Sequence, residues 1–224
     1  MKSSARQDNP LSKERIIEEA IAILDDAGEH SLTFRTLADR LSTGAGALYH
    51  YVDSKEALLS AATGKVIETS LTEQKTYHDA AFAIKETART LWTAAEAHPW
   101  IGVRLLVDPT RTSIARIYEA VGSKLEVLGV PATEQFDVAS AICNYILGNV
   151  TQQSSNARLS VALAQQGYDR KKYLEEMTKP WKELDKDEYP FMHSIIAQFP
   201  EHDDFKQYLS GIDLLLAGIE KNYS

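Results

Sequence analysis

Residues 33–59 read TFRTLADRLSTGAGALYHYVDSKEALL, and this stretch decides the fold. Its first apolar residues recur with the helical spacing i, i+3, i+4, i+7: Phe34, Leu37, Ala38 and Leu41. After a short break the same spacing returns, at Ala45, Leu48, Tyr49 and Val52. Two short helices joined by a tight turn form a helix-turn-helix pattern, in which the second helix enters the major groove of DNA.

The second helix begins with Gly44 and Gly46, although glycine costs a helix about 1 kcal/mol relative to alanine. Small residues at this place let the backbone approach DNA and leave N–H groups free to face phosphate. The methyl groups of Ala45 and Ala47 suit contact with a thymine methyl. We therefore predict that the segment Gly44–Tyr51 contacts DNA. The alternative is a plain loop in a helical bundle that binds nothing.

The flanking residues agree with this reading. Thr33 is placed to cap the first helix of the motif, and Asp53 with Glu56 forms an acidic capping box for a helix that begins near Ser54. Arg35 can reach a phosphate or a guanine. Lys55 stands at the start of the next helix, where its ammonium and the free N–H groups both favour phosphate.

Helical periodicity extends over the rest of the chain, and we find no alternating strand pattern. An amphipathic helix over Ile17, Ile21, Leu24 and Ala27 ends at Gly28. We expect further helices over residues 82–97, 112–128, 134–156, 189–198 and 204–222. Residues 165–187 are dense in charge and contain Pro180, so we expect a mobile surface connection.

Composition limits the class of protein. With 44% hydrophobic and 25% charged residues among 224, the chain has the balance of a soluble globular protein. The net charge is −8, and residues 1–65 hold 8 lysines and arginines against 10 aspartates and glutamates. DNA affinity must therefore come from a few well-placed cations. Cys143 is the single cysteine, which excludes an internal disulfide and fits a cytoplasmic setting. We find neither a membrane span nor a secretory signal.

The motif resembles the N-terminal DNA-binding domain of the TetR repressor family. The matching residues are Thr33, Arg35, Leu37, Ala38, Leu48, Tyr49 and Ser54–Leu59. The chain departs at Ser42 and Thr43, where the family more often has Gly-Val, which implies constrained backbone angles at Ser42. The resemblance implies that the DNA-binding residues are Thr33, Arg35, Gly44, Ala45, Gly46, Ala47, Tyr49, His50, Tyr51 and Lys55.

The C-terminal part is more weakly similar to the tetracycline-repressor branch, through NYILGNV (144–150) and YLSGIDLLLAGIEK (208–221). The resemblance implies an all-α homodimer that leaves palindromic operator DNA when a small molecule binds. We expect a flexible arm (1–12), a helix-turn-helix domain (13–62) and a helical ligand-binding and dimerisation domain (63–224). Leu71 and Arg104 stand where that repressor has ligand-binding histidines, so tetracycline is not expected. The six histidines show no metal-ligand spacing, so we expect no metal and no cofactor.

Aromatic and polar residues on the later helices suit a pocket with apolar walls and a few polar groups. These candidates are Phe82, Trp92, Trp100, Leu105, Tyr118, Asn144, Tyr145 and Gln152. For each one, a place in the core is the stronger alternative. Asn144 and Gln152 are better candidates because an amide in an apolar helix needs a partner, although that partner could equally lie across a dimer interface.

The dimer interface is expected at the two most apolar long helices, 134–156 and 204–222, paired with their symmetry copies. One stripe is formed by Ile212, Leu215, Leu216 and Ile219, and Leu214 adds apolar surface on another side. The helix from Ser54 to about Leu71 covalently links the two domains, and we expect its tilt to transmit the signal, with Ala57, Leu58 and Leu59 packed on the DNA-binding helices. Gly64 is either a soft point in it or a site of close packing.

Three functions compete. The first is a ligand-responsive transcriptional regulator, most often a repressor in this family. The second is a regulator without a small-molecule effector that acts through a protein partner, and a large closed pocket would favour the first over it. The third is an all-helical enzyme, but we find no nucleophile motif, carboxylate pair or phosphate loop, so we predict that the chain is not an enzyme.

Overall fold

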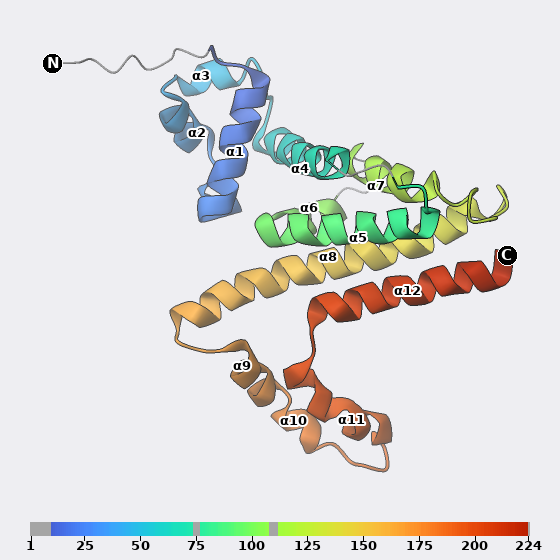
Figure 1. Cartoon of the computed structure of the whole chain (residues 1–224). Coiled ribbons are helices and arrows are strands. Elements are labelled where there is room, and N and C mark those ends of the chain that lie inside the picture. Colours follow the sequence, from blue (N-terminus) through green and yellow to red (C-terminus); the bar gives the residue numbers. More distant parts are fainter. Residues whose placement is uncertain (1–9, 74–76, 108–111, 224) are drawn as a thin grey trace.

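The computed structural model describes residues 10–73, 77–107 and 112–223, and within these ranges the chain is helical and has no strand (Figure 1). The all-α prediction is confirmed, whereas most of the expected N-terminal arm lies outside the described residues. None of the described helices combines the length and apolarity needed to cross a membrane. The elements are α1 (Lys13–Ala27), η1 (Glu29–Ser31), α2 (Phe34–Leu41), α3 (Ala45–Leu48), α4 (Lys55–Thr72), α5 (Ala80–Ala97), α6 (Ile101–Val107), α7 (Thr112–Gly122), α8 (Gln135–Gln165), α9 (Arg170–Met177), α10 (Lys179–Lys182), α11 (Pro190–Ile195), η2 (Ile196–Glu201) and α12 (Asp204–Tyr223).

Side-chain caps define the N-terminal helices. The Thr33 hydroxyl accepts a hydrogen bond from the Thr36 N–H at 3.0 Å, as predicted, and Gly28 ends α1 with φ +73°. The predicted cap of α4 is wrong by one residue, because Ser54 rather than Asp53 accepts the hydrogen bond from the Ala57 N–H. Each cap satisfies an N–H that the first turn of a helix leaves without an intrahelical acceptor.

The turn between α2 and α3 depends on a left-handed residue. Ser42 has φ 53° and ψ 44°, and among the described residues it is the one non-glycine with positive φ. Two backbone hydrogen bonds close the turn, from Thr43 N to Ala38 O (3.0 Å) and from Ser42 N to Asp39 O (3.3 Å). This pair of bonds is the Schellman arrangement, which usually has glycine at the left-handed position. The constrained angles predicted at Ser42 are confirmed.

Several predicted boundaries need correction. The expected helix over residues 45–52 shortens to α3, after which the chain continues in turns to Tyr51. Helix α7 ends at Gly122 rather than at residue 128, and α8 continues to Gln165 rather than ending at 156. Helix α6 is not among the predicted helices, because its seven residues are too few to show a helical period.

Within the expected surface connection over residues 165–187 the chain forms two short helices, α9 and α10, whose residues are mostly exposed, and the mobility of the segment stays a prediction. The Asp169 carboxylate caps α9 by accepting from the Lys171 N–H at 2.7 Å, and Arg170 pairs with Asp204 at 2.8 Å. Pro180 lies in the first turn of α10, where its missing N–H costs nothing. The charges that suggested a loop are therefore partly used in caps and ion pairs.

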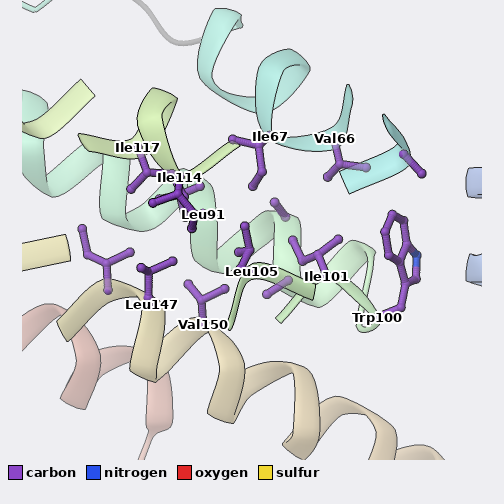
Figure 2. Packing of buried hydrophobic residues seen from close by; sticks show 14 of the residues in the cluster. Val66, Ile67, Leu91, Trp100, Ile101, Leu105, Ile114, Ile117, Leu147 and Val150 are labelled. Atoms are coloured by element: carbon purple, nitrogen blue, oxygen red, sulfur yellow. The ribbon is translucent and has the colours of Figure 1, made fainter. Parts of the chain in front are cut away.

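The core is one continuous cluster that reaches from α1 to α12. Helix α8 crosses beneath α5, α6 and α7, with α12 beside it, whereas α9, α10 and α11 project from its far end (Figure 1). Figure 2 shows the centre of the cluster, where Ile101 and Leu105 of α6 lie above Val150 of α8. Helix α4 joins both ends of this core, so the domain boundary predicted at residue 62 falls inside an unbroken helix and stays a prediction.

Replacing Ser42 by glycine should stabilise the protein by about 1 kcal/mol, because glycine adopts the left-handed conformation without the steric cost that serine carries. Urea denaturation measures the change. The control Ser60→Gly, inside α4, should destabilise by roughly 0.5 kcal/mol through lost helix propensity. A Ser42→Gly variant no more stable than the parent would contradict the geometry described for the turn.

Candidate nucleic-acid interface

The predicted DNA-contacting residues lie at the end of the molecule formed by α2 and α3, away from α8 (Figure 1). Leu48 and Val52 are buried beneath them, so the short helix is anchored from inside. Three of the residues are partly buried, namely Ala45, Ala47 and Lys55. The others are exposed: Thr33, Arg35, Gly44, Gly46, Tyr49, His50 and Tyr51.

The two glycines are not required by the protein itself. Gly44 has an ordinary extended backbone (φ −85°, ψ 141°), and a Cβ placed on Gly44 or Gly46 would meet no atom within 4 Å. Gly102 behaves differently, because a Cβ there would lie 2.4 Å from the Ser154 hydroxyl. The fold therefore gives no steric reason for glycine at 44 and 46, as it gives none at Gly64 or Gly148, and the role of the two glycines at DNA stays a prediction.

Two tyrosines shape the same surface. The ring of Tyr49 stacks on Phe34 with centroids 4.3 Å apart, yet Tyr49 stays 54% exposed. The Tyr51 hydroxyl donates to the Leu11 carbonyl at 2.9 Å. This bond fixes the start of α1 beside the turn after α3, and local sequence patterns could not reveal it because the two residues are 40 positions apart.

Two cations near this surface differ in how many of their N–H donors are already bound by the protein. Arg40 donates hydrogen bonds to Asp26 and Glu19 of α1, which raise the pKa of its guanidinium and commit it to joining α1 and α2. Lys55 donates to the Glu29 main-chain oxygen at 2.7 Å. An ammonium has three N–H donors, so two remain for a phosphate. The role of Lys55 at DNA stays a prediction.

Three of the predicted ligand residues are core residues. The ring of Trp92 stacks on Tyr208 with centroids 5.0 Å apart, and Leu105 packs inside the cluster. Trp100 is also buried, and its Nε1 donates to the Asp25 carboxylate at 2.7 Å. Trp100 therefore connects the α5–α6 junction to α1.

The other five candidates do not gather at one place. Phe82 lines an open groove between α5 and α12, whereas Gln152 lines a hollow of about 290 Å³ between α8 and α9. The Tyr145 hydroxyl donates to the Tyr208 carbonyl at 3.0 Å, and the Tyr118 hydroxyl lies 3.4 Å from that of Ser140. Asn144 is exposed on α8. A common pocket for these eight residues stays a prediction.

Titratable groups give no sign of a second kind of site. In the described ranges, no three His, Cys, Asp or Glu side chains gather in a way that could hold a metal ion. Burial raises the pKa of the Cys143 thiol to about 12, so it carries almost no thiolate near neutral pH. The expectation of no metal stays a prediction.

Comparisons with known proteins agree with this geometry. Residues 16–62 match the family model described as "Bacterial regulatory proteins, tetR family", and residues 72–223 match the model "Tetracyclin repressor-like, C-terminal domain". The second match alone covers more than half of the chain.

The most informative solved structure is that of the transcriptional regulator SCO7222, a TetR from Streptomyces coelicolor. It is 38% identical, with a TM-score of 0.82, and the alignment covers 96% of this chain and 100% of that one. ActR of Streptomyces coelicolor in complex with actinorhodin has a TM-score of 0.73 at 22% identity, over 96% and 99% of the two chains, which is a likeness of fold. An HTH-type transcriptional regulator of Saccharopolyspora erythraea is 27% identical over 149 residues, 64% of this chain and 61% of that relative.

A Gly46→Ala substitution should have opposite effects on stability and on DNA binding. Alanine favours the helix by up to about 1 kcal/mol, and the open space accepts its methyl, so the free protein should become more stable. The same methyl holds the backbone away from DNA, so affinity for a duplex selected from a random pool by the wild-type protein should fall. Denaturation and fluorescence anisotropy measure the two effects.

The control is Gly122→Ala, at the end of α7, where a Cβ also meets open space. It should leave DNA affinity unchanged. If Gly46→Ala bound the selected duplex as tightly as the parent, close approach of DNA would not explain the glycine.

Proposed function

The chain belongs to the TetR family of transcriptional regulators, and from this premise we propose that it is a cytoplasmic homodimeric repressor released from palindromic operator DNA by a small, mostly apolar molecule. The observation that carries the DNA part is the glycine pair at 44 and 46, which the fold itself does not require. The family's relatives bear the names of regulators, so regulation rather than catalysis is the function that we propose.

Dimer formation is proposed through α8 and α12, which lie side by side (Figure 1). The predicted stripe on α12 packs largely within its own chain, because Ile212 and Ile219 are buried there. Leu214 instead points outward at 74% exposure, and Asn144 and Gly148 are exposed on α8. A symmetry copy placed on this surface would cover Leu214 and bring small residues of α8 into close contact.

The two recognition segments of such a dimer must match successive major grooves, about 34–36 Å apart. A palindromic site presents the same half-site to each copy, which is why we propose an operator of this form. Any change in the relative orientation of the two copies would therefore lower affinity, because the two segments could no longer reach their half-sites at the same time.

The effector is proposed from the fold and from the apolar side chains of the C-terminal helices. ActR was solved with actinorhodin bound, and this chain shares its fold. The helices around α5 to α8 supply mostly apolar side chains, so an effector that enters between them should be mostly apolar. It would act by preferring the free dimer over the operator complex, since a ligand shifts an equilibrium by its differential affinity alone.

Ala47→Glu should abolish DNA binding and leave the fold intact, because Ala47 is only partly buried and a carboxylate there would face phosphate. Lys55→Ala should weaken binding to all sequences and flatten its dependence on salt. Anisotropy with the selected duplex measures both, and circular dichroism checks folding. Full affinity of a folded Ala47→Glu protein would show that α3 does not face DNA.

An effector found by a thermal-shift screen of apolar compounds should weaken affinity for the selected duplex, and the duplex should weaken effector affinity by the same factor. Paired calorimetric titrations measure the two factors. Equal affinity of the compound for free and DNA-bound protein would contradict release by this effector, and a compound that bound the DNA complex alone would be a corepressor.

A further inference from the structure

Helix α6 is fastened to α8 by close polar contacts. The Gly102 N–H donates to the Ser154 hydroxyl at 3.1 Å, and the Thr151 hydroxyl shares its proton between the Gly102 carbonyl at 3.1 Å and the Leu147 carbonyl at 2.8 Å. The missing side chain of Gly102 makes this approach possible, because a Cβ would collide with Ser154. On the inner side, Ile101 and Leu105 pack into the core (Figure 2). Any movement of α8 at this level is therefore passed to α6.

Arg104 of the same helix reaches the N-terminal unit. Its side chain is only 7% exposed, and its two terminal nitrogens are directed to two carboxylates. Nη2 donates to Glu56 Oε1 in the first turn of α4, and Nη1 lies 3.7 Å from Glu29 Oε1 in η1. Its Nε is buried and has no partner in the described part of the chain. The two glutamates therefore hold the buried charge, which would be costly to leave unpaired.

Both glutamates are direct neighbours of Lys55. Glu56 follows Lys55 in the chain, and the main-chain oxygen of Glu29 accepts the Lys55 ammonium at 2.7 Å. Glu29 thus faces Arg104 with its carboxylate and Lys55 with its carbonyl. Three residues further on, η1 leads into Leu32 and the Thr33 cap of α2.

We propose that Arg104 is a positioning residue for DNA binding, which fixes Glu29 and Glu56 and thereby orients the Lys55 ammonium toward phosphate. The inference rests on the proposed contact of Lys55 with DNA. A free lysine side chain loses rotamer freedom when it binds a phosphate, and an ammonium already held by the Glu29 carbonyl loses less of it. Arg104 thus raises affinity without touching DNA.

The same contacts make Lys55 sensitive to the C-terminal helices. A shift of α6 relative to α4 and η1 withdraws the guanidinium from both glutamates, and the Lys55 ammonium then loses its fixed direction. These polar contacts therefore connect the two parts of the chain, in addition to the covalent connection through α4.

The test compares the wild-type protein with Arg104→Met, Lys55→Ala and the double variant on the selected duplex over a series of salt concentrations. Arg104→Met should weaken binding roughly tenfold, the size expected for one charge-assisted hydrogen bond. The slope of log affinity against log salt should lose about 0.9, as it does for Lys55→Ala, because one phosphate contact is lost. In the double variant, Arg104→Met should add less than about twofold, since the contact it supports is already gone.

Two further variants separate this role from a general loss of packing. Arg104→Lys should recover part of the affinity, because an ammonium can reach one carboxylate but cannot bridge two. Arg116→Met is the matched control: Arg116 also pairs a C-terminal helix with α4, through Glu68 at 2.8 Å, but lies away from Lys55. It should keep wild-type affinity and slope.

Wild-type affinity and slope in Arg104→Met would overturn the proposal, and so would losses that add fully in the double variant. If Arg104→Met does not fold, Glu29→Gln decides the question. Removing a negative charge beside DNA should tighten binding through simple electrostatics, whereas loss of the Arg104 anchor should weaken it, so tighter binding overturns the proposal. Unchanged affinity of Lys55→Ala, or of folded Ala47→Glu, would instead contradict the proposed DNA interface itself.

Discussion

Helix α4 is buried against both parts of the molecule, and the rest of the structure depends on this constraint. Near its start, Leu58 and Leu59 are buried where α4 packs on α1, and further along Val66 and Ile67 join the cluster formed with α5, α6 and α7 (Figure 2). Eighteen residues at 1.5 Å per residue make a rod of about 27 Å. Because both ends of this rod lie in one apolar core, the DNA-facing surface cannot be reoriented without disturbing the packing of the C-terminal helices.

Apolar packing alone would leave the relative position of the two parts loosely defined, and polar contacts make it specific. The Asp25 carboxylate of α1 lies 2.8 Å from His98 Nδ1 and accepts a hydrogen bond from Trp100 Nε1, at the junction that leads into α6. One turn further along α6, Arg104 reaches η1 and α4. Hydrogen bonds and ion pairs form only at certain distances and angles, and they are stronger at reduced dielectric. They therefore favour one relative position of the two parts of the chain over others close to it. A regulator needs such a discrete arrangement, because a ligand can then select against it.

Local periodicity and caps predicted those parts of the fold that short-range physics determines. Thr33 and Gly28 act where the sequence placed them, and the strain expected at Ser42 is present. The cap of α4 was missed locally, by one residue, whereas other failures come from dependence on distant residues. Helix α6 is too short to show a period and exists through its contacts with α8, and Arg104 is indistinguishable from a surface charge until Glu29 and Glu56 are brought to it. The predicted ligand residues stay a prediction, because an aromatic side chain on an apolar helix face fits a core as well as a pocket.

The DNA-facing surface and the helices around α6 should move together, so that binding at one is felt at the other. Hydrogen–deuterium exchange of the free protein and of its complex with the selected duplex tests this claim directly. Residues 33–55 should become protected by contact with DNA. Peptides covering α6 and residues 147–154 of α8 should also change their exchange rates, although they lie far from the bound duplex. A change confined to residues 33–55 would show that the C-terminal helices do not sense DNA, and it would contradict the account.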